Sequence, residues 1–177
     1  VNAAAHYTQI SDFQATTFTG TGFNLQNAGD IIVKGIELEA TWLMTESTEL
    51  HAVASRTLAN FDEFKRGTCW VAYTWHTGID DPGRVEPNDP FCSRDDDRVG
   101  FEPQNSLSLM LNHYFEVGNY PASASIDYQY TGDVFLDDAN DPYKYADDFS
   151  LFNVRVSFTI PQWDSEIIAW SRNVFDE

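Results

Sequence analysis

The chain has 177 residues, about the length of one domain. Its 10 Lys and Arg residues stand against 28 Asp and Glu residues, so the formal net charge is −18. Such a charge repels phosphate groups, which argues against nucleic-acid binding and against membrane anchoring by a basic patch. A hydrophobic content of 42 % with 15 % aromatic residues predicts an ordered chain.

Apolar and polar residues alternate with a period of two, and helical periodicity is absent from the sequence. The alternation is clearest at residues 36–42, where Glu37 and Glu39 interleave with apolar residues. One sheet face is therefore expected to be apolar and the other polar. We predict an all-β chain with seven strands near residues 1–15, 31–43, 48–60, 105–115, 122–131, 149–160 and 165–173.

The predicted connections alternate between short and long. Residues 45–47, 117–121 and 161–164 form short turns, whereas residues 16–30, 61–104 and 132–148 form long polar loops. This alternation is typical of an antiparallel transmembrane β-barrel in an outer membrane, whose apolar face contacts lipid and whose polar face lines the lumen. A soluble secreted β-sandwich that binds carbohydrate is the alternative, with both apolar faces packed inward. The sequence contains no run of about 18 apolar residues, the length that a transmembrane helix needs.

Aromatic residues lie near several predicted strand ends and suggest interfacial girdles, although ordinary strand-forming aromatics would give the same pattern. These residues are Tyr7, Trp42, Tyr114, Tyr128, Tyr130 and Trp170.

The two cysteines, Cys69 and Cys92, lie in one predicted loop. They are compatible with a single disulfide in an oxidising compartment or with two free thiols. A disulfide would stabilise the loop by roughly 3 kcal/mol.

Three segments resemble the C-terminal half of TonB-dependent outer-membrane receptors. Residues 27–29 (NAG) and 35–40 (GIELEA) resemble a strand pair of that family, and residues 50–64, which end in ANFDEF, resemble its next strand. Residues 152–155 and 169–177 (AWSRNVFDE) resemble the segment before the last strand. Val174 replaces the family's usual Leu, and the 61–104 loop does not match beyond its cysteine pair.

The resemblance implies that residues 1–177 are about seven consecutive strands of a 22-stranded barrel, without the plug domain, the TonB-coupling segment or the final strand. It further implies a receptor in the outer membrane of a Gram-negative bacterium that imports a scarce ligand, such as a ferric siderophore, with energy from TonB. The expected partners are outer-membrane lipid and lipopolysaccharide, the receptor's own plug domain, the TonB complex and a small-molecule or metal-chelate ligand.

Four charged strand residues, Glu37, Glu39, Asp127 and Arg155, are expected to face the lumen and hold the plug. Aromatic loop residues are the candidates for ligand contact, although they could instead pack the loops on themselves. These candidates are Trp70, Tyr73, Trp75, His76, Phe91, Tyr143 and Tyr145.

Clustered carboxylates can bind Ca²⁺, so the run Asp95, Asp96 and Asp97 is a candidate calcium site at the cell surface. A solvated acidic loop is the alternative, and no other cofactor is expected. The four histidines show no paired spacing typical of metal ligands.

Enzyme motifs are absent from the sequence, which contains no nucleophile elbow, P-loop or zinc-type cysteine pattern. The pair Glu37 and Glu39 could in principle serve a glycosidase. Lining of a lumen explains these residues better, so we do not predict an enzyme.

Overall fold

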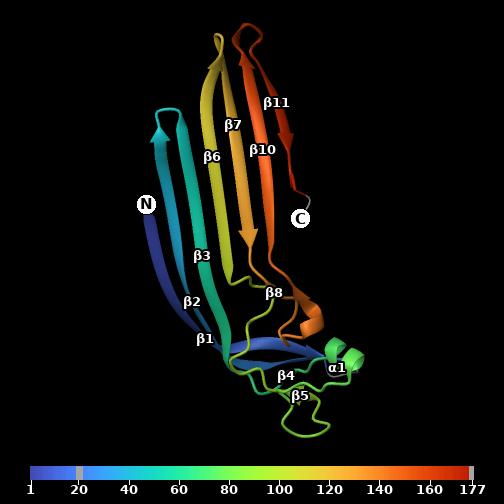
Figure 1. Cartoon of the computed structure of the whole chain (residues 1–177). Helices are drawn as coiled ribbons and strands as arrows, with labels where there is room; N and C mark the ends of the chain where they lie inside the picture. Colours follow the sequence, from blue (N-terminus) through green and yellow to red (C-terminus); the bar gives the residue numbers. More distant parts are fainter. Residues whose placement is uncertain (19–21, 176–177) are drawn as a thin grey trace.

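The computed structural model describes residues 1–18 and 22–175, and most of them lie in one antiparallel sheet of seven strands (Figure 1). The strand order in the sheet is the order along the chain. The strands are β1 (Asn2–Phe18), β2 (Phe23–Thr45), β3 (Thr48–Glu63), β6 (Asn105–Val117), β7 (Tyr120–Thr131), β10 (Phe149–Ile160) and β11 (Ser165–Ser171). The predicted seven-stranded meander is therefore confirmed.

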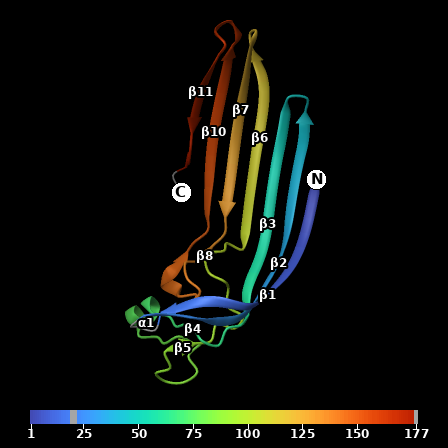
Figure 2. The ribbon, with the colours of Figure 1, turned by 180° about the vertical axis from the view of Figure 1, so that it is seen from behind.

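The short turns lie at one end of the sheet and the long loops at the other, in both views (Figures 1 and 2). The long loops contain the two-stranded sheets β4–β5 (Gly67–Thr68 and Phe91–Cys92) and β8–β9 (Val134–Phe135 and Tyr145–Ala146). They also contain helix α1 (Ala72–Thr77) and the 3₁₀ turn η1 (Pro142–Lys144), while a second 3₁₀ turn, η2 (Pro161–Trp163), joins β10 to β11. None of the described helices is long and apolar enough to cross a membrane.

The strand register separates polar and apolar side chains onto opposite faces of the sheet, because residues paired across strands point to the same side. Glu37 pairs with Ser55, Ser55 with Ser106, and Ser106 with Thr131. The other face carries Ile36, Leu38 and Trp42 on β2, Leu107, Leu109 and Leu111 on β6, and Phe152, Val154, Val156 and Phe158 on β10.

The apolar face of the sheet is exposed. Leu38 is 50 % exposed, Val156 is 49 % exposed and Ile167 is 59 % exposed. Among the described residues there is no second large sheet to cover them. The sandwich alternative is therefore wrong for this chain, because a sandwich packs two sheets face to face.

Apart from Ala122 near a short turn, the buried apolar residues of the described chain gather at the loop end of the sheet. Phe61 is fully buried and packs with Phe64, Ile31 and Ala15, and Phe13 and Val99 add to the cluster. The rings of Phe61 and Phe64 lie 4.9 Å apart. This core holds the loops to the sheet rather than one sheet to another.

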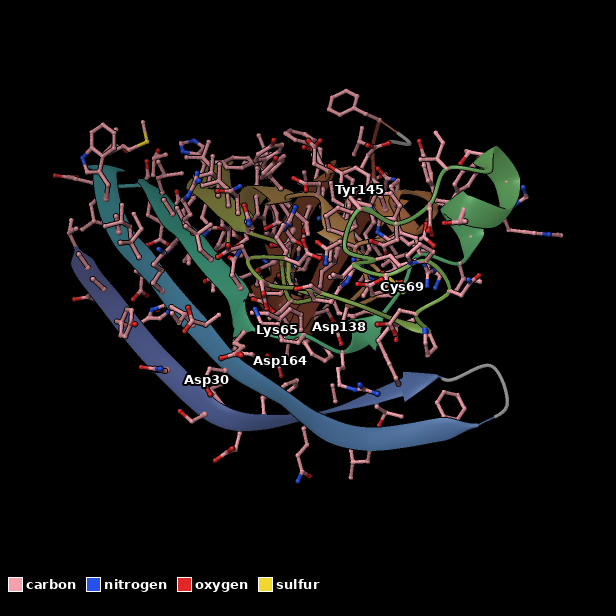
Figure 3. The ribbon with its side chains drawn as sticks, turned by 90° about the horizontal axis from the view of Figure 1, so that it is seen from below. Asp30, Lys65, Cys69, Asp138, Tyr145 and Asp164 are labelled. Carbon is pink, nitrogen blue, oxygen red and sulfur yellow. A yellow bond between two sulfur atoms is a disulfide. The ribbon has the colours of Figure 1, made fainter. Side chains whose placement is uncertain are left out.

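The prediction of a loop at residues 16–30 is wrong, since β1 and β2 continue there as a hairpin and Gln14 pairs with Asn27. Residues 19–21 lie outside the described part, as do Asp176 and Glu177 of the C-terminal motif. The pairing persists because a bulge between Ile10 and Phe13 bends the hairpin instead of ending it. Figure 3 shows its far end leaving the line of the other strands and passing alongside the loops.

Two residues with positive φ mark this bend, Asp12 (56°) and Gly29 (83°). The Asp30 carboxylate accepts hydrogen bonds from the Gln9 amide, the Ser11 hydroxyl and the Asp12 backbone N–H. A side chain at Gly29 would place its Cβ 1.8 Å from the Glu63 carbonyl oxygen. Glycine is thus required at position 29 by both conformation and space.

We predict that Gly29→Ala loosens the bent hairpin more than Gly78→Ala loosens helix α1. Gly78 also has a positive φ, of 73°, but nothing lies within 4 Å of a Cβ there. The Gly78 variant is expected to cost about 1–2 kcal/mol through conformation alone, and the Gly29 variant more than that. Hydrogen exchange on full-length protein in detergent tests the difference, at the amides of residues 10–15 in the Gly29 variant and of residues 72–77 in the Gly78 variant. Equal local protection in Gly29→Ala and the unsubstituted protein would contradict it.

Candidate functional site

Residues 64–104 and 132–148 come together at one end of the sheet and form a cap, the name used below for these two segments (Figure 1). The segments are far apart in the sequence, yet hydrogen bonds connect them. The backbone N–H of Phe101 donates to the Phe135 carbonyl, and the Gly100 N–H donates to the Asp138 carboxylate at 2.9 Å. Arg98 forms an ion pair with Asp133, with a nitrogen–oxygen distance of 2.6 Å.

Asp141 is the central connection within the cap. Its carboxylate is fully buried and accepts backbone N–H groups from Val71 (3.1 Å), Ala72 (2.8 Å) and Tyr73 (3.1 Å). These donors are the unpaired N–H groups at the beginning of α1, where a negative charge is favourable. The carboxylate also accepts a fourth backbone N–H, from Tyr143 in the 3₁₀ turn η1, which directly follows Asp141. One carboxylate therefore fixes a helix and a turn from different loops.

A buried ion pair lies beside this connection. The Arg94 guanidinium, 2 % exposed, lies 2.5 Å from the carboxylate of Asp81 and 3.1 Å from that of Asp97. Arg94 also donates to the Ala139 carbonyl, which accepts the indole N–H of Trp70 as well. Asp81 in turn accepts the backbone N–H of Trp70. Removing the Arg94 charge would leave the Asp81 carboxylate buried without its ion-pair partner, which is strongly destabilising.

Cys69 and Cys92 are joined by a disulfide, 23 residues apart in sequence. The bond lies at the two-stranded sheet β4–β5, in which Gly67 pairs with Cys92. The disulfide closes a loop that contains α1. The same loop is hydrogen-bonded to Asp141 of the other cap segment.

The structure brings five of the seven aromatic candidates into one cluster. Trp70 contacts Tyr73, Tyr73 contacts Tyr143, and Tyr143 stacks on His76 with ring centroids 4.9 Å apart. Trp75 follows at 5.0 Å from His76 and is 81 % exposed. The residues of this aromatic cluster, Trp70, Tyr73, Trp75, His76 and Tyr143, come from α1, η1 and the residue next to the disulfide.

The other two aromatic candidates lie elsewhere in the cap. The guanidinium of Arg66 lies 4.0 Å from the ring centroid of Phe91, and Tyr145 packs edge-on against Phe135. Neither belongs to the aromatic cluster, so the sequence-based set divides into a group of five and two separate rings.

Several acidic residues of the cap accept hydrogen bonds or form ion pairs with protein donors. Asp95 accepts the Phe64 N–H and pairs with Lys65, Asp97 pairs with Arg94, and Asp137 pairs with Lys144. Within the described residues, the one group of three potential metal ligands within 4.8 Å is Cys69, Asp81 and Cys92, and its two sulfurs are in the disulfide. Calcium binding by Asp95, Asp96 and Asp97 therefore stays a prediction without a preformed cluster.

Among the carboxyl groups of the cap whose pKa values are shifted, Asp97 and Asp133 shift in opposite directions. Burial raises the pKa of the Asp97 carboxyl despite the neighbouring Arg94. The hydrogen bond from Arg98 lowers the pKa of Asp133. Because the folded pKa of Asp133 is the lower one, this pair stabilises the cap above the unfolded pKa, and the contribution is lost as pH falls through the folded value.

The four charged strand candidates share one face of the sheet. Glu37 and Glu39 lie on β2, Asp127 pairs with Asn153, and Arg155 pairs with Trp170. Side-chain hydrogen bonds continue across this face, from Asn153 to Asp127 (2.7 Å), between Ser123 and Ser157 (2.9 Å), and between Ser55 and Ser106 (2.8 Å). The face is a connected polar wall.

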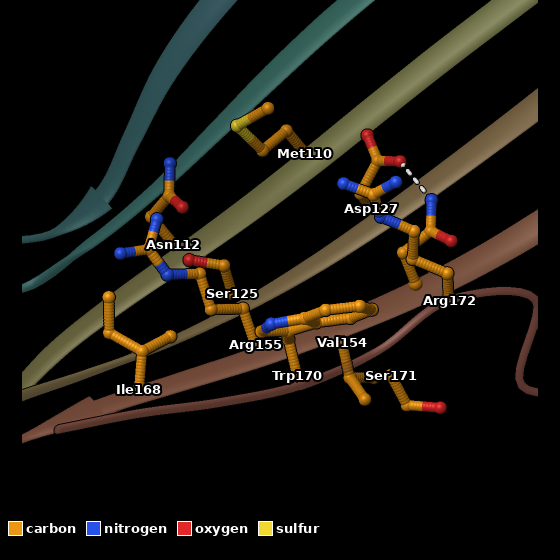
Figure 4. A pocket seen from close by; sticks show the side chains of 11 residues that line it. Met110, Asn112, Ser125, Asp127, Val154, Arg155, Ile168, Trp170, Ser171 and Arg172 are labelled. Atoms are coloured by element: carbon orange, nitrogen blue, oxygen red, sulfur yellow. Dashed lines mark hydrogen bonds between the residues drawn. The ribbon is translucent and has the colours of Figure 1, made fainter.

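A hollow of about 600 Å³ lies on this polar face beside β10 and β11 (Figure 4). Asp127, Arg155, Trp170 and Arg172 line it, and the Arg172 guanidinium lies 5.1 Å from the Trp170 ring centroid. The register also places Tyr114 on this face, where its hydroxyl donates to Glu49 at 3.1 Å. The girdle prediction is thus wrong for Tyr114 and Trp170, which lie on the polar face with the charged residues.

Sequence reasoning missed the structural role of Asp141 and the existence of α1. Asp141 precedes a proline, and an acidic residue before Pro is a common start of a turn, which was the available signal. Nothing in the sequence indicates that its carboxylate reaches a helix about 70 residues away.

Comparisons with known proteins give one family and one fold. The family model described as "TonB dependent receptor-like, beta-barrel" matches residues 1–174. Among solved structures, the ferric yersiniabactin uptake receptor FyuA from Yersinia pestis is similar, with a TM-score of 0.67 and 18 % sequence identity. The match covers 99 % of this chain and 22 % of the FyuA chain. No curated protein sequence matches.

We predict that Asp141→Asn releases the beginning of α1, because an amide accepts on one atom only and loses the charge that favours the helix terminus. A loss of about 1–3 kcal/mol of local stability is expected. Faster hydrogen exchange at residues 71–73 would show it. Asp138→Asn is the matched control, since Asp138 accepts one N–H, from Gly100. Unchanged exchange at residues 71–73 in Asp141→Asn would contradict the assigned role.

Proposed function

The chain belongs to the TonB-dependent receptor β-barrel family, and we propose that it forms part of the wall of an outer-membrane transport receptor. The observation that supports this most is the sheet itself. One face is polar and hydrogen-bonded, and the other exposes aliphatic side chains that water would not tolerate. A bilayer covers such a face in a transmembrane barrel.

The sheet has two open edges, which further strands are proposed to fill. Its order begins with β1 and ends with β11, and among the described residues these two strands do not pair. In a bilayer each unpaired backbone group costs several kcal/mol, so an open sheet edge is not viable there. The chain also spans about a fifth of the FyuA chain that it matches. We infer that the seven strands of this sheet are part of a larger closed barrel.

The lengths of the connections indicate how the sheet would be oriented in the outer membrane. Barrels of this kind have short periplasmic turns and longer extracellular loops. The cap would therefore face the outside of the cell, and the turns at residues 45–48, 117–120 and 160–165 would face the periplasm. An external cap is also an oxidising setting, in which the Cys69–Cys92 disulfide persists.

The polar face would line the lumen and hold the plug domain of the complete receptor. Glu37, Glu39, Asp127 and Arg155 would supply charged groups to it, while the Ser and Asn side chains would supply hydrogen bonds. Transport would then draw on TonB through the plug, as in the family. The family consists of transport receptors and is not an enzyme class.

The aromatic cluster is the proposed ligand-contact surface of the cap. Trp75 is 81 % exposed and Tyr143 is 56 % exposed, so both rings have free faces or edges. The disulfide and Asp141 hold the segment that carries them, and aromatic rings on a rigid support contact ligands at low entropic cost. We propose that they contact a scarce ligand such as a ferric siderophore, since the similar protein FyuA is a ferric yersiniabactin uptake receptor.

The test is uptake of a panel of ⁵⁵Fe-labelled siderophores by iron-starved cells that express the full-length receptor. Uptake is expected to require TonB, and the double variant Trp75→Ala/Tyr143→Ala is expected to weaken it about tenfold or more through loss of two ring contacts. Trp163→Ala is the matched control, since Trp163 is also exposed (74 %) but lies in η2 at the opposite end of the sheet.

Two results would overturn the proposal. Accumulation of the full-length protein outside the outer membrane would contradict the barrel assignment. Equal uptake with and without TonB for every siderophore that is taken up would contradict coupled transport. Normal uptake in the Trp75/Tyr143 variant would instead remove only the ligand-contact role.

A further inference from the structure

Two basic side chains project from the apolar face of the sheet at its cap end. Lys34 and Arg56 have the same parity as Ile36 and Ala54 on their strands, and Ile36 pairs directly with Arg56. The Arg56 guanidinium donates to the Asn105 side chain at 3.5 Å, on the same face. Both cations are exposed. They therefore lie on the side that the proposed function assigns to lipid.

Their level along the strands matches a membrane boundary. On β2 the apolar face runs from Trp42 near the short turn to Ile36, and Lys34 is the next residue on that face. Lys34 to Trp42 is a stretch of nine residues, and a tilted barrel strand needs about 9–11 residues to cross the hydrocarbon core. Lys34 and Arg56 are thus placed where hydrocarbon ends and headgroups begin.

On the neighbouring strands, tyrosine side chains lie at the same height on the apolar face as Lys34 and Arg56. Tyr7 on β1 pairs with Lys34 and is 65 % exposed, and Tyr130 on β7 pairs with Leu107, two residues beyond Asn105. Tyrosines in such positions occupy the headgroup region of membranes. The pair of cations is therefore embedded in a row of interfacial residues that crosses β1, β2, β3, β6 and β7.

The two cations lack carboxylate partners, in contrast to most basic residues of this acidic chain. In the part of the chain that the structure describes, neither Lys34 nor Arg56 lies within 4.0 Å of a carboxylate oxygen. Six other basic residues do: Lys65, Arg84, Arg94, Arg98, Lys144 and Arg155. A chain with 28 acidic residues has thus left its two lipid-side cations available for an external anion.

We propose that Lys34 and Arg56 bind the phosphate groups of glycolipid headgroups in the outer leaflet of the outer membrane. The inference rests on the proposed function, because it requires the apolar face to contact lipid. A guanidinium and an ammonium on adjacent strands match a phosphate monoester, which accepts several charge-assisted hydrogen bonds. The net charge of −18 does not oppose this, since only the local charges at the headgroup level act on the lipid within a screening length.

Nearby carboxylates restrict where a phosphate can bind along the strands. A groove of about 350 Å³ on the same face, on the cap side of Lys34, is lined by Asp62 and Asp96 as well as by Lys34 and Asn60. Its carboxylates would repel a phosphate placed further from the membrane. The anion is therefore accepted on the membrane side of Lys34, between it and Arg56.

The experiment measures binding of bis-phosphorylated lipid A to the full-length receptor in detergent, by native mass spectrometry. The double variant Lys34→Gln/Arg56→Gln is expected to lower the affinity about tenfold or more, since two charge-assisted contacts are lost. Dephosphorylated lipid A is expected to bind the unsubstituted receptor and the variant equally. The control Arg172→Gln removes one cation from the opposite face; it is compared with the single variant Arg56→Gln and is expected to leave lipid A affinity unchanged.

The outcomes separate this inference from the proposed function. Equal affinity of the receptor and Lys34→Gln/Arg56→Gln for bis-phosphorylated lipid A would overturn the phosphate site while leaving transport intact. A loss in Arg172→Gln equal to that in Arg56→Gln would also overturn it, because the effect would then follow net charge and not position. A receptor that is absent from the outer membrane would instead refute the proposed function.

Discussion

Backbone hydrogen bonding between neighbouring strands is the constraint on which the rest of this molecule depends. A sheet whose apolar face meets lipid can satisfy its N–H and C=O groups only sideways, so its strands must be long, regular and paired on both edges. The period-two alternation follows from this, because each strand separates a polar wall from an apolar wall. The scarcity of buried apolar residues in the membrane part of the sheet has the same origin, since the intended solvent of that face is hydrocarbon.

The cap obeys a different rule. It has little apolar core of its own, and buried polar groups hold it together: Asp141 at the beginning of α1, Arg94 between two aspartates, and the Cys69–Cys92 disulfide. Such groups are costly unless every one is partnered, so they specify one arrangement of the two loops. The acidic composition of the cap is thereby explained in part by structure, because many of its carboxylates accept backbone or cationic donors.

The membrane part of the fold was predictable from sequence, and the cap was not. Alternation around Glu37 and Asn153 gives strands and their faces because period two is local. The continuation of β1 and β2 past residue 15 escaped prediction, since a bulge at Asp12 and Gly29 interrupts the alternation without ending the pairing. The aromatic candidates were predicted as a set, but which of them meet depends on Asp141, a contact between loops that no local pattern encodes.

Spin labels along β10 can show whether one face of this sheet meets lipid and the other a watery lumen. Both cysteines of this chain are in the disulfide, so single cysteines can be introduced one by one at positions 152–158 of the full-length receptor in outer membranes, with any free cysteine outside residues 1–177 replaced first. Relaxation by lipid-soluble oxygen should peak at 152, 154, 156 and 158, and relaxation by a water-soluble nickel chelate at 153, 155 and 157. Equal access of the nickel chelate to both sets would mean that the apolar face does not contact lipid.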